Sequence, residues 1–556
     1  MESKRFVLRM LPFLSLTSLS SGCGLILGLD QFTEGAASST STGSSSASTG
    51  GAGGMGTGGG TSGTGGSTCV AGTVEACYGG PVPTRAVGAC KDGKHTCNAD
   101  GSGWGACVGE VLPAAEDPST KADENCDGFA GGDTVWAKRF GDDTFQVATS
   151  VAVDEAGNIY VTGYFKGTMQ FGATVLSAMG AQDIFVAKFD PSGATLWATR
   201  FGGAGTARPQ SIVIDSTGNI ILTGVGSSSL KFGGGDVGAG IFVAKLDSSA
   251  GHIWSKSCGG SAGIYKLYPK AVVDKNGDVL LAGNFDGTAN CGSGSYKAAG
   301  SDDILLAKLS GADGAGLWSR QFGTASSEAA SGVAVDSIGN VLITGVFDQM
   351  ISLDFGNLVN AGGHDIFAAK FDSNGNSIWS YSWGDATDQT VSDVAVDSLD
   401  GPVMAGSLGA SAFGLVSTGY SDAFAARLTS TGTLSWGKNI GGTTSMSQAY
   451  ASGVAVDAND GAVVGGSFIG NVKFGSDTFT NTSLYNAYIA RLDKQGALLW
   501  GKAFADADVT ASDEVRDVAF GPNSEIIMVG RVGGPVDFGT GPLAGTHGIF
   551  VAKLAP

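Results

Sequence analysis

The sequence is poor in positive charge and in histidine. Its 32 lysines and arginines face 51 aspartates and glutamates, and only four histidines occur in 556 residues. The net charge of −19 leaves little to neutralise a phosphate backbone, which argues against a nucleic-acid partner. No Ser/His/Asp or Cys/His arrangement has a recognisable context. We therefore predict no catalytic residue and expect a protein that is not an enzyme.

Long apolar runs are missing as well, because nothing after the N-terminal segment reaches the length that spans a bilayer. The N-terminal segment has the pattern of a targeting signal, with a basic stretch (Lys4–Arg9) before a short apolar one (Met10–Leu19). It ends in Ser-Gly-Cys23 and resembles a bacterial lipobox, although Ser20 stands where leucine is usual. The resemblance implies a signal peptide over 1–22 and a lipid on Cys23. The alternative is an ordinary secretory signal that contains a cysteine.

Residues 23–68 are rich in glycine, serine and threonine and have few large apolar side chains. Such a composition cannot bury enough apolar surface to offset its ordering entropy, so we expect a flexible tether. A tether of this kind has an obvious use when one end is anchored. We therefore expect an exported lipoprotein at the outer membrane or cell surface of a bacterium, held to the membrane through its lipid.

The next segment, 69–132, is dense in cysteine. An even number of cysteines at this density in an exported chain predicts a small disulfide-stapled module, and the sequence leaves the pairing open. The six are Cys69, Cys77, Cys90, Cys97, Cys107 and Cys126.

The spacing of these cysteines, with Gly103-Trp104-Gly105 and a closing Asp-Glu-Asn-Cys-Asp-Gly, resembles the cysteine-rich metal-binding repeat of bacterial surface proteins. Asp123, Asn125 and Asp127 alternate before Gly128, so their oxygens are candidate ligands for Ca²⁺ or another metal ion. Asn125 replaces an aspartate that is usual in the repeat, which removes one charge. The alternative is a solvated acidic turn beside a disulfide, in a module that is purely structural.

From residue 133 to residue 556 the sequence is repetitive. A tryptophan recurs every 57 to 64 residues, at Trp136, Trp197, Trp254, Trp318, Trp379, Trp436 and Trp500. Each repeat offers four short apolar or alternating runs punctuated by glycine, asparagine and aspartate, which predicts a four-stranded antiparallel sheet. One such sheet cannot bury two apolar faces alone, whereas stacking sheets around an axis buries both. The sequence predicts an all-β fold.

The repeats resemble the SBBP-type β-propeller repeat, which implies a seven-bladed β-propeller of four-stranded blades. The last repeat stops at Leu554 without a tryptophan strand, and a spare strand stands in front of the first repeat at 134–141. We predict that this strand completes the last blade and closes the ring. An aspartate recurs in the first hairpin of six blades, where we expect it to cap the turn and not to bind a cation.

Two further cysteines stand in the propeller where other repeats have phenylalanine. Cys258 replaces a residue equivalent to Phe201, and Cys291 one equivalent to Phe171. Both positions fall on one face of the ring between blades 2 and 3. We predict a disulfide, with Cα atoms about 4.4 to 6.8 Å apart. Two buried free thiols are the alternative.

The loops that reach the channel are predicted to carry mostly small polar residues. Charged exceptions are expected to be scattered, at Arg208, Lys270, Glu328, Asp393, Asp513, Glu514 and Arg516. His252, His364 and His547 are expected in turns away from the channel. These patterns favour a surface binding or scaffolding protein with an unidentified protein or carbohydrate ligand at a propeller face. The alternatives are a lyase-type or quinone-type propeller enzyme with its site at the channel mouth, and a structural envelope spacer.

Overall fold

The computed structural model describes residues 69–556, apart from 115, 118–119, 121, 143, 261–267, 355, 482–483 and 505–510. The predicted signal peptide, Cys23 and the tether lie outside the described residues. No helix within the described ranges is long and apolar enough to cross a membrane.

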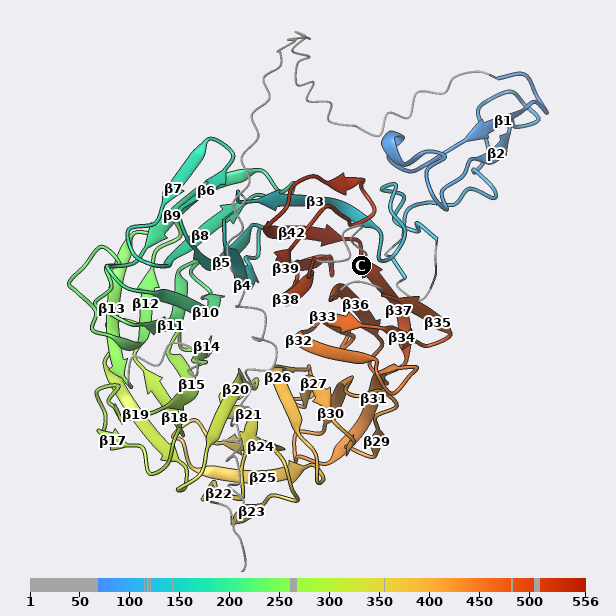
Figure 1. Ribbon diagram of the computed structural model, residues 1–556. Coiled ribbons are helices and arrows are strands. Elements are labelled where there is room, and N and C mark those ends of the chain that lie inside the picture. Colours follow the sequence, from blue (N-terminus) through green and yellow to red (C-terminus); the bar gives the residue numbers. More distant parts are fainter. Residues whose placement is uncertain are drawn as a thin grey trace, which may run out of the picture.

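Seven antiparallel blades of four strands each form a ring (Figure 1), and in blades 2 and 5 a short strand pair of the next blade extends the sheet to six strands. The first strand of each sheet lies nearest the axis, and the fourth lies at the rim. Blade 1 consists of β4 (Gln146–Val153), β5 (Ile159–Phe165), β8 (Asp183–Phe189) and β9 (Thr195–Phe201), and blade 2 of β10 (Ala207–Ile214), β11 (Ile220–Gly226), β12 (Gly240–Leu246) and β13 (His252–Gly259). Blade 3 consists of β14 (Lys270–Val273), β15 (Val279–Phe285), β18 (Asp303–Leu309) and β19 (Gly316–Phe322), and blade 4 of β20 (Glu328–Val335), β21 (Val341–Phe347), β24 (Asp365–Phe371) and β25 (Ser377–Trp383).

Blade 5 consists of β26 (Gln389–Val396), β27 (Pro402–Leu408), β30 (Asp422–Leu428) and β31 (Leu434–Gly442), and blade 6 of β32 (Gln448–Val456), β33 (Ala462–Ile469), β36 (Asn486–Leu492) and β37 (Leu498–Phe504). Blade 7 consists of β38 (Glu514–Phe520), β39 (Ile526–Val532), β42 (Gly548–Leu554) and β3 (Thr134–Phe140). The all-β, seven-bladed architecture predicted from the repeats is confirmed.

Short strand pairs decorate the segments between second and third strands. They are β6 (Thr168–Phe171) with β7 (Thr174–Ser177), β16 (Thr288–Ala289) with β17 (Tyr296–Lys297), β22 (Met350–Ser352) with β23 (Asn357–Val359), β28 (Ser411–Ala412) with β29 (Leu415–Val416), β34 (Asn471–Phe474) with β35 (Asp477–Thr480), and β40 (Val536–Asp537) with β41 (Pro542–Leu543).

The ring closes through the N-terminal strand, as predicted. Strand β3 pairs antiparallel with β42 as the outermost strand of blade 7, with Ala137 opposite Ala552. It ends at Phe140, one residue before the predicted boundary of 141. Closure by a strand from the opposite end of the chain leaves the ring without an open seam.

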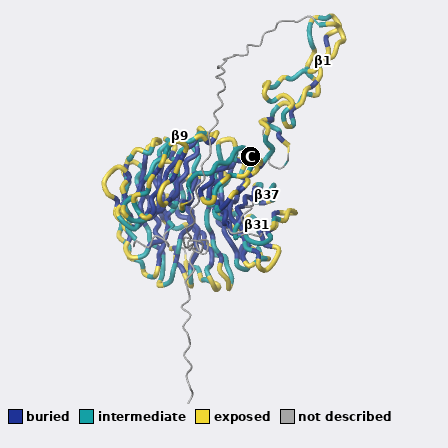
Figure 2. The backbone as a smooth tube through the Cα atoms, turned by 45° about the horizontal axis from the view of Figure 1, so that its top comes forward, coloured by how far each residue is buried: buried dark blue, intermediate teal, exposed yellow. Residues whose placement is uncertain are grey.

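The core lies between blades. Second and third strands such as β5 and β12 are buried along their whole length, since each blade is covered on both faces (Figure 2). Seven hydrophobic clusters result, and each is shared by two neighbouring blades. One of them joins blade 7 to blade 1 and so completes the ring of contacts. This is why strands in the interior read as continuous apolar runs and not as alternating ones.

Aromatic pairs fasten the blades to one another near their outer strands. Phe140 packs on Phe171 with ring centroids 5.2 Å apart, and Phe201 packs on Phe232 at 5.4 Å. Between blades 2 and 3 the same place is taken by a disulfide, because Cys258 is bonded to Cys291 with their Cα atoms 4.4 Å apart. The predicted propeller disulfide is confirmed.

A second contact between neighbouring blades recurs at the rim, where a tryptophan indole packs against a turn of the next blade. The indole of Trp136 lies against Gly193 in the turn between the third and fourth strands of the next blade, and its Nε1 donates to the Pro191 carbonyl at 3.1 Å. The indoles that donate in the same way to a carbonyl of the next blade are Trp254, Trp318, Trp379 and Trp436.

Blade 7 has no such turn, because its fourth strand comes from the N-terminal side of the chain. Gly132, with φ 79°, takes the place of the turn glycine against Trp500, and Lys502 donates to its carbonyl. The Ala555 N–H donates to the Asp133 carbonyl at 2.8 Å, so both ends of the propeller meet there.

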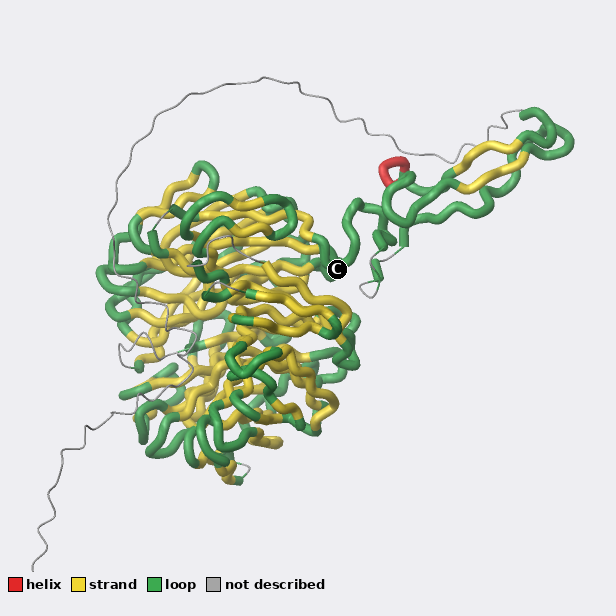
Figure 3. The backbone as a smooth tube through the Cα atoms, turned by 45° about the vertical axis from the view of Figure 1, so that its right-hand side comes forward, coloured by secondary structure: helices red, strands yellow, loops and turns green. Residues whose placement is uncertain are grey.

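The disulfide-rich segment precedes the ring (Figure 3). It contains strands β1 (Val74–Cys77) and β2 (Gly93–Thr96), which pair antiparallel, and a short 3-10 helix, η2 (Val82–Thr84). Its three disulfides, Cys69–Cys97, Cys77–Cys107 and Cys90–Cys126, use all six predicted cysteines. Four disulfides in one chain are typical of an oxidising, extracytoplasmic compartment.

Candidate functional site in the central channel

A cavity of about 1000 Å³ follows the ring axis and is lined by residues from the innermost strands of all seven blades. Six of these strands slip in register by one residue, which marks a β-bulge. A bulge re-aims side chains and is frequent beside functional sites. The six bulged residues all line the cavity, and they are Thr149, Gln210, Ser331, Ser392, Ser452 and Arg516.

The residue after the bulge is the axial position, and it repeats once in each blade. In blades 1 to 7 it is Ser150, Ser211, Lys270, Gly332, Asp393, Gly453 and Asp517. Ser211 accepts the N–H of Ala271 in the next blade at 3.1 Å, and Asp393 accepts that of Val454 at 3.2 Å. The axial serine and aspartate side chains therefore accept backbone N–H groups of the following blade while they line the cavity.

Three axial residues bring charge together from alternate blades. The Lys270 ammonium lies 2.7 Å from Asp393 Oδ1 and also donates to the Ser392 carbonyl at 3.0 Å. It passes blade 4, whose axial residue Gly332 has no side chain. Blade 6 has an axial glycine too, and a Cβ on Gly453 would lie 3.2 Å from Asp517 Oδ1. The two glycines thus leave room for the charged residues of blades 3, 5 and 7.

Asp517 is the most perturbed acid of this group. Its Oδ2 accepts the Val151 N–H of blade 1 at 2.9 Å, and its Oδ1 accepts the Val518 N–H at 2.8 Å. Protein surrounds the carboxyl, although part of it opens onto the cavity. Burial first, and then the negative charge of Asp393, raise the pKa of Asp517 to about 6, against the opposing effects of Lys270 and the N–H donors.

The rest of the lining adds tyrosines and more charge. Tyr164, Tyr268, Tyr420 and Tyr450 line the cavity. The Arg208 guanidinium lies 4.5 Å from the centroid of the Tyr164 ring and donates to Gln182 at 2.8 Å. Faces of aromatic rings beside a polar floor suit a ligand with both apolar and hydrogen-bonding surfaces.

Two expectations about the channel need correction. Of the seven charged residues predicted to be scattered, Arg208, Lys270, Asp393 and Arg516 line one cavity, whereas Glu328, Asp513 and Glu514 are not among its lining residues. His364 is not remote either: it lines the same cavity, with Nδ1 2.9 Å from Asp388 and Nε2 3.2 Å from Asp348. Sequence reasoning omitted Asp517, whose signal was an aspartate at the axial position of the last repeat.

The recurring hairpin aspartates lie at the opposite ends of the first strands and cap their turns as predicted. Asp154 Oδ1, for example, accepts the N–H groups of Ala156 at 3.1 Å and of Asn158 at 2.8 Å. The sequence did not reveal that each also meets a cation on the third strand of its own blade. The pairs are Asp154–Lys188, Asp215–Lys245, Asp274–Lys308, Asp336–Lys370, Asp397–Arg427 and Asp457–Arg491.

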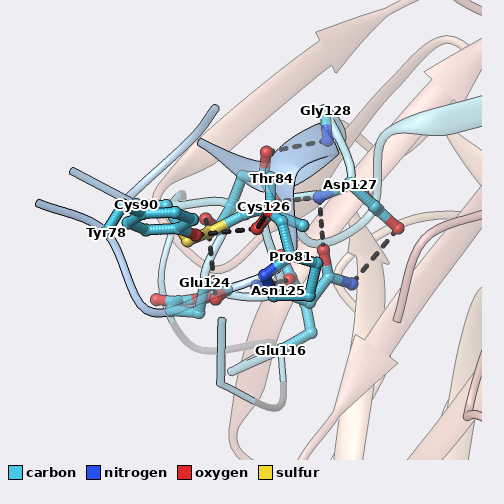
Figure 4. Close-up of a disulfide and its surroundings, with 11 residues drawn as sticks. Tyr78, Pro81, Thr84, Cys90, Glu116, Glu124, Asn125, Cys126, Asp127 and Gly128 are labelled. Carbon is cyan, nitrogen blue, oxygen red and sulfur yellow. Dashed lines mark hydrogen bonds between the residues drawn. A yellow bond between two sulfur atoms is a disulfide. The ribbon is translucent and has the colours of Figure 1, made fainter. Parts of the chain in front are cut away.

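The candidate metal ligands form a compact turn beside the Cys90–Cys126 disulfide (Figure 4). Asp123 accepts the N–H groups of Asp127 at 3.1 Å and of Gly128 at 2.9 Å, while Asn125 Oδ1 accepts the Asp127 N–H at 2.9 Å. The side-chain oxygens of Asp123 and Asn125 therefore accept backbone N–H groups of the turn itself, and both accept that of Asp127. In the described part of the chain, no three or more His, Cys, Asp or Glu side chains are grouped to hold a metal. The arrangement fits an acidic turn, and the metal hypothesis stays a prediction.

Comparison with known proteins agrees with the fold. Residues 135–164 match the SBBP family, described as a beta-propeller repeat. A WD repeat-containing protein of Acanthamoeba polyphaga mimivirus, described as uncharacterized, is 22% identical over 332 residues; the match covers 47% of this chain and 24% of that protein. The chain thus spans about a quarter of that relative's length.

Solved structures show the same kind of likeness at low identity. An ulvan lyase of a polysaccharide lyase family is 13% identical with a TM-score of 0.42, covering 76% of this chain and 96% of its own. A virginiamycin B lyase from Staphylococcus aureus is 10% identical with a TM-score of 0.40, covering 76% and 99%. The SBBP match and the sheet topology of the chain itself establish a β-propeller repeat within a seven-bladed, disulfide-bonded fold.

Proposed function

We propose that this protein is a membrane-anchored, extracytoplasmic binding protein that takes a ligand in the central channel of its propeller. The observation that carries the proposal is the cavity of about 1000 Å³, to which all seven blades contribute hydroxyls, charges or backbone. A volume of this size suits a small molecule or the end of a chain. The bulges aim side chains into it, and the closed ring holds them rigidly.

Four disulfides and the lipobox-like Cys23 support export and anchoring. We expect the native chain in the membrane fraction and Cys23→Ser in the soluble fraction of the same compartment. Metabolic labelling with a radioactive fatty acid should mark the native chain alone. Equal release of both chains would refute the anchor and leave the binding proposal standing.

The binding proposal is tested by blocking the channel. Ser452→Trp places an indole at a bulged position of blade 6, and Ser476→Trp places one on an exposed hairpin of the same blade. The chain would be probed against an array of bacterial and host glycans and envelope proteins. We expect the native chain and Ser476→Trp to bind the same target and Ser452→Trp to lose it. Loss in neither variant would place binding elsewhere than in the channel.

A second candidate is an enzyme, because charged groups of several blades do converge at the axis. A carboxyl with a pKa near neutrality is suited to general acid–base chemistry, and Asp517 faces the cavity. The test is turnover of acidic and neutral polysaccharides, followed by new reducing ends. Turnover by the native chain that disappears in Asp517→Asn would favour the enzyme over the binding protein.

A further inference from the structure

The two ends of the blades differ in how their carboxylates are compensated. At the first hairpins, Lys or Arg faces the repeated aspartate in six blades, and in blade 7 Lys553 lies 2.9 Å from Glu525. Hydrogen bonds and Lys245 hold the pKa of Asp215 below its usual range even though burial opposes them. These acids have their counterions within the protein.

In the channel the cations are already engaged. Lys270 is paired with Asp393, and Arg516 lies 2.6 Å from Glu514. Within the described part of the chain, no lysine or arginine lies at ion-pair distance from Asp517, whose contacts are N–H groups and the Ser150 hydroxyl. A carboxylate in such a site is stabilised by any cation that can enter the cavity.

We propose that the channel binds the protonated amine of its ligand, with the ammonium group between Asp517 and Asp393 and the rest of the molecule among the lining tyrosines. This inference rests on the proposed channel-binding function and names the chemical class of the ligand. An ammonium group carries three donors, and the axial positions of blades 7, 5 and 1 supply acceptors: the carboxylates of Asp517 and Asp393 and the hydroxyl of Ser150, all of which line the cavity.

An organic cation fits this site better than a calcium ion does. Ca²⁺ takes six to eight oxygens, whereas each of the two carboxylates here already accepts a backbone N–H. Tyrosine faces attract organic cations, because the ring quadrupole is negative over its face. Tyr268 and Tyr420 line the same cavity and are not fully buried, which leaves part of their surface to a ligand.

Two sources can supply a primary amine, and paired probes distinguish them. For an amino sugar the probe is the glucosamine trimer, and its N-acetylated form is the uncharged control ligand. For a protein the probe is an N-acetylated, amidated Gly-Lys-Gly peptide, with its N⁶-acetyl-lysine form as the match. Calorimetric titration of the full chain at pH 7.5 and low salt should show at least one charged probe binding about tenfold or more tightly than its acetylated match.

Two variants move the affinity in opposite directions. Asp517→Asn keeps an oxygen for the Val151 N–H but removes the charge, so the charged probe should bind at least about tenfold more weakly. Lys270→Met releases Asp393 from its ion pair, so the same probe should bind several-fold more tightly. Asp236→Asn removes the same charge from an exposed loop, where Asp236 lies 3.6 Å from Lys231, and should change nothing. Circular dichroism of each variant shows whether the propeller is folded.

The outcomes separate this inference from the proposed function. Equal binding of charged and acetylated trimers that is lost in Ser452→Trp would overturn the ammonium site and keep the channel as a binding site. Binding of CaCl₂ but of neither amine would overturn it in favour of an inorganic cation. Amine binding that survives both Ser452→Trp and Asp517→Asn would overturn both the ammonium site and the channel as its location.

Discussion

At the scale of single residues, the axial position shows how a repeat diversifies. Seven equivalent positions hold serine, lysine, glycine or aspartate in a frame that the repeat leaves otherwise alike. The glycines of blades 4 and 6 matter as much as the charged residues, because a side chain there would meet Val394 or Asp517. Chemistry at the axis is therefore set by residues that are present in some blades and absent in others.

Asp517 makes stability depend on pH. Its folded pKa of about 6 lies above the value of about 3.9 for an unfolded aspartate. The folded state therefore binds more protons between these values, and the stability contributed by Asp517 falls as the pH rises through this window. We expect Asp517→Asn to be more stable than the native chain at pH 8 by up to about 3 kcal/mol, a difference that vanishes below about pH 4.

Denaturant unfolding at a series of pH values measures this effect. Asp236→Asn serves as the control, because its carboxylate is exposed beside Lys231 and its substitution should leave the pH profile unchanged. A native chain whose stability relative to Asp517→Asn is the same at pH 4 and pH 8 would contradict the assignment.

At the scale of elements, most blade interfaces are fastened twice, by an aromatic pair or the disulfide and by a tryptophan against a glycine turn. Between blades 5 and 6, Ile440 stands where other blades have the aromatic ring, and the turn of blade 2 has Ala250, with φ 66°, in place of the glycine. The disulfide between β13 and the segment after β16 replaces a pair that other interfaces make with aromatic rings. Both cysteines are fully buried, in a cluster with Phe285 and Leu305. The position was visible in the sequence because the repeat predicts phenylalanine there.

The Cys258→Ala, Cys291→Ala double variant should lose about 2–4 kcal/mol of stability, because the bond closes a loop of 33 residues and its removal leaves a cavity in the core. Thermal unfolding followed by circular dichroism measures the loss. A short incubation of the native chain with dithiothreitol should leave its melting temperature unchanged, since the bond is inaccessible. A double variant with the native melting temperature would show that the bond contributes nothing to the interface.

Substitution of Gly132 tests the contact between Trp500 of blade 6 and the segment before β3 of blade 7. Gly132→Ala should be destabilised by about 2–3 kcal/mol, because it combines a positive φ with a clash against Trp500, 2.8 Å from the added Cβ. Gly218→Ala has the same backbone strain at φ 81° in open space and should lose only about 1 kcal/mol. Comparable losses in the two variants would mean that the contact with Trp500 has no part in closure.

At the scale of the whole molecule, a strand from the start of the repeat region holds the last blade. A chain that begins at residue 142 lacks β3 and leaves β42 as an exposed edge, which favours aggregation. It also loses the Phe140–Phe171 contact between blades 7 and 1. We expect this chain to aggregate and to melt at a lower temperature than a chain that begins at residue 69.

Size-exclusion chromatography and thermal unfolding compare the two chains. Addition of a peptide of residues 132–141 should restore a monomer in part, because it supplies both the strand and Gly132. A monomeric, equally stable chain from residue 142 would contradict the closure.

Much of this molecule could be predicted from the sequence alone. The number of blades, the order of strands, the closing strand and the Cys258–Cys291 pair all follow from one repeated pattern. The reason is physical: a four-stranded sheet with two apolar faces is stable when it is stacked, and a departure from the repeat marks the equivalent place in space.

The candidate site was decided by tertiary structure. Lys270 and Asp393 are separated by 123 residues, and no local pattern says which blades face each other across the axis. The β-bulges add a second reason, because a slip of one residue turns a side chain to another face than simple alternation predicts. The position of His364 in a turn before a third strand was predicted correctly, but only the folded ring shows that this turn lines the cavity. The sequence determined the ring, and only its closure in space determined which charges meet inside it.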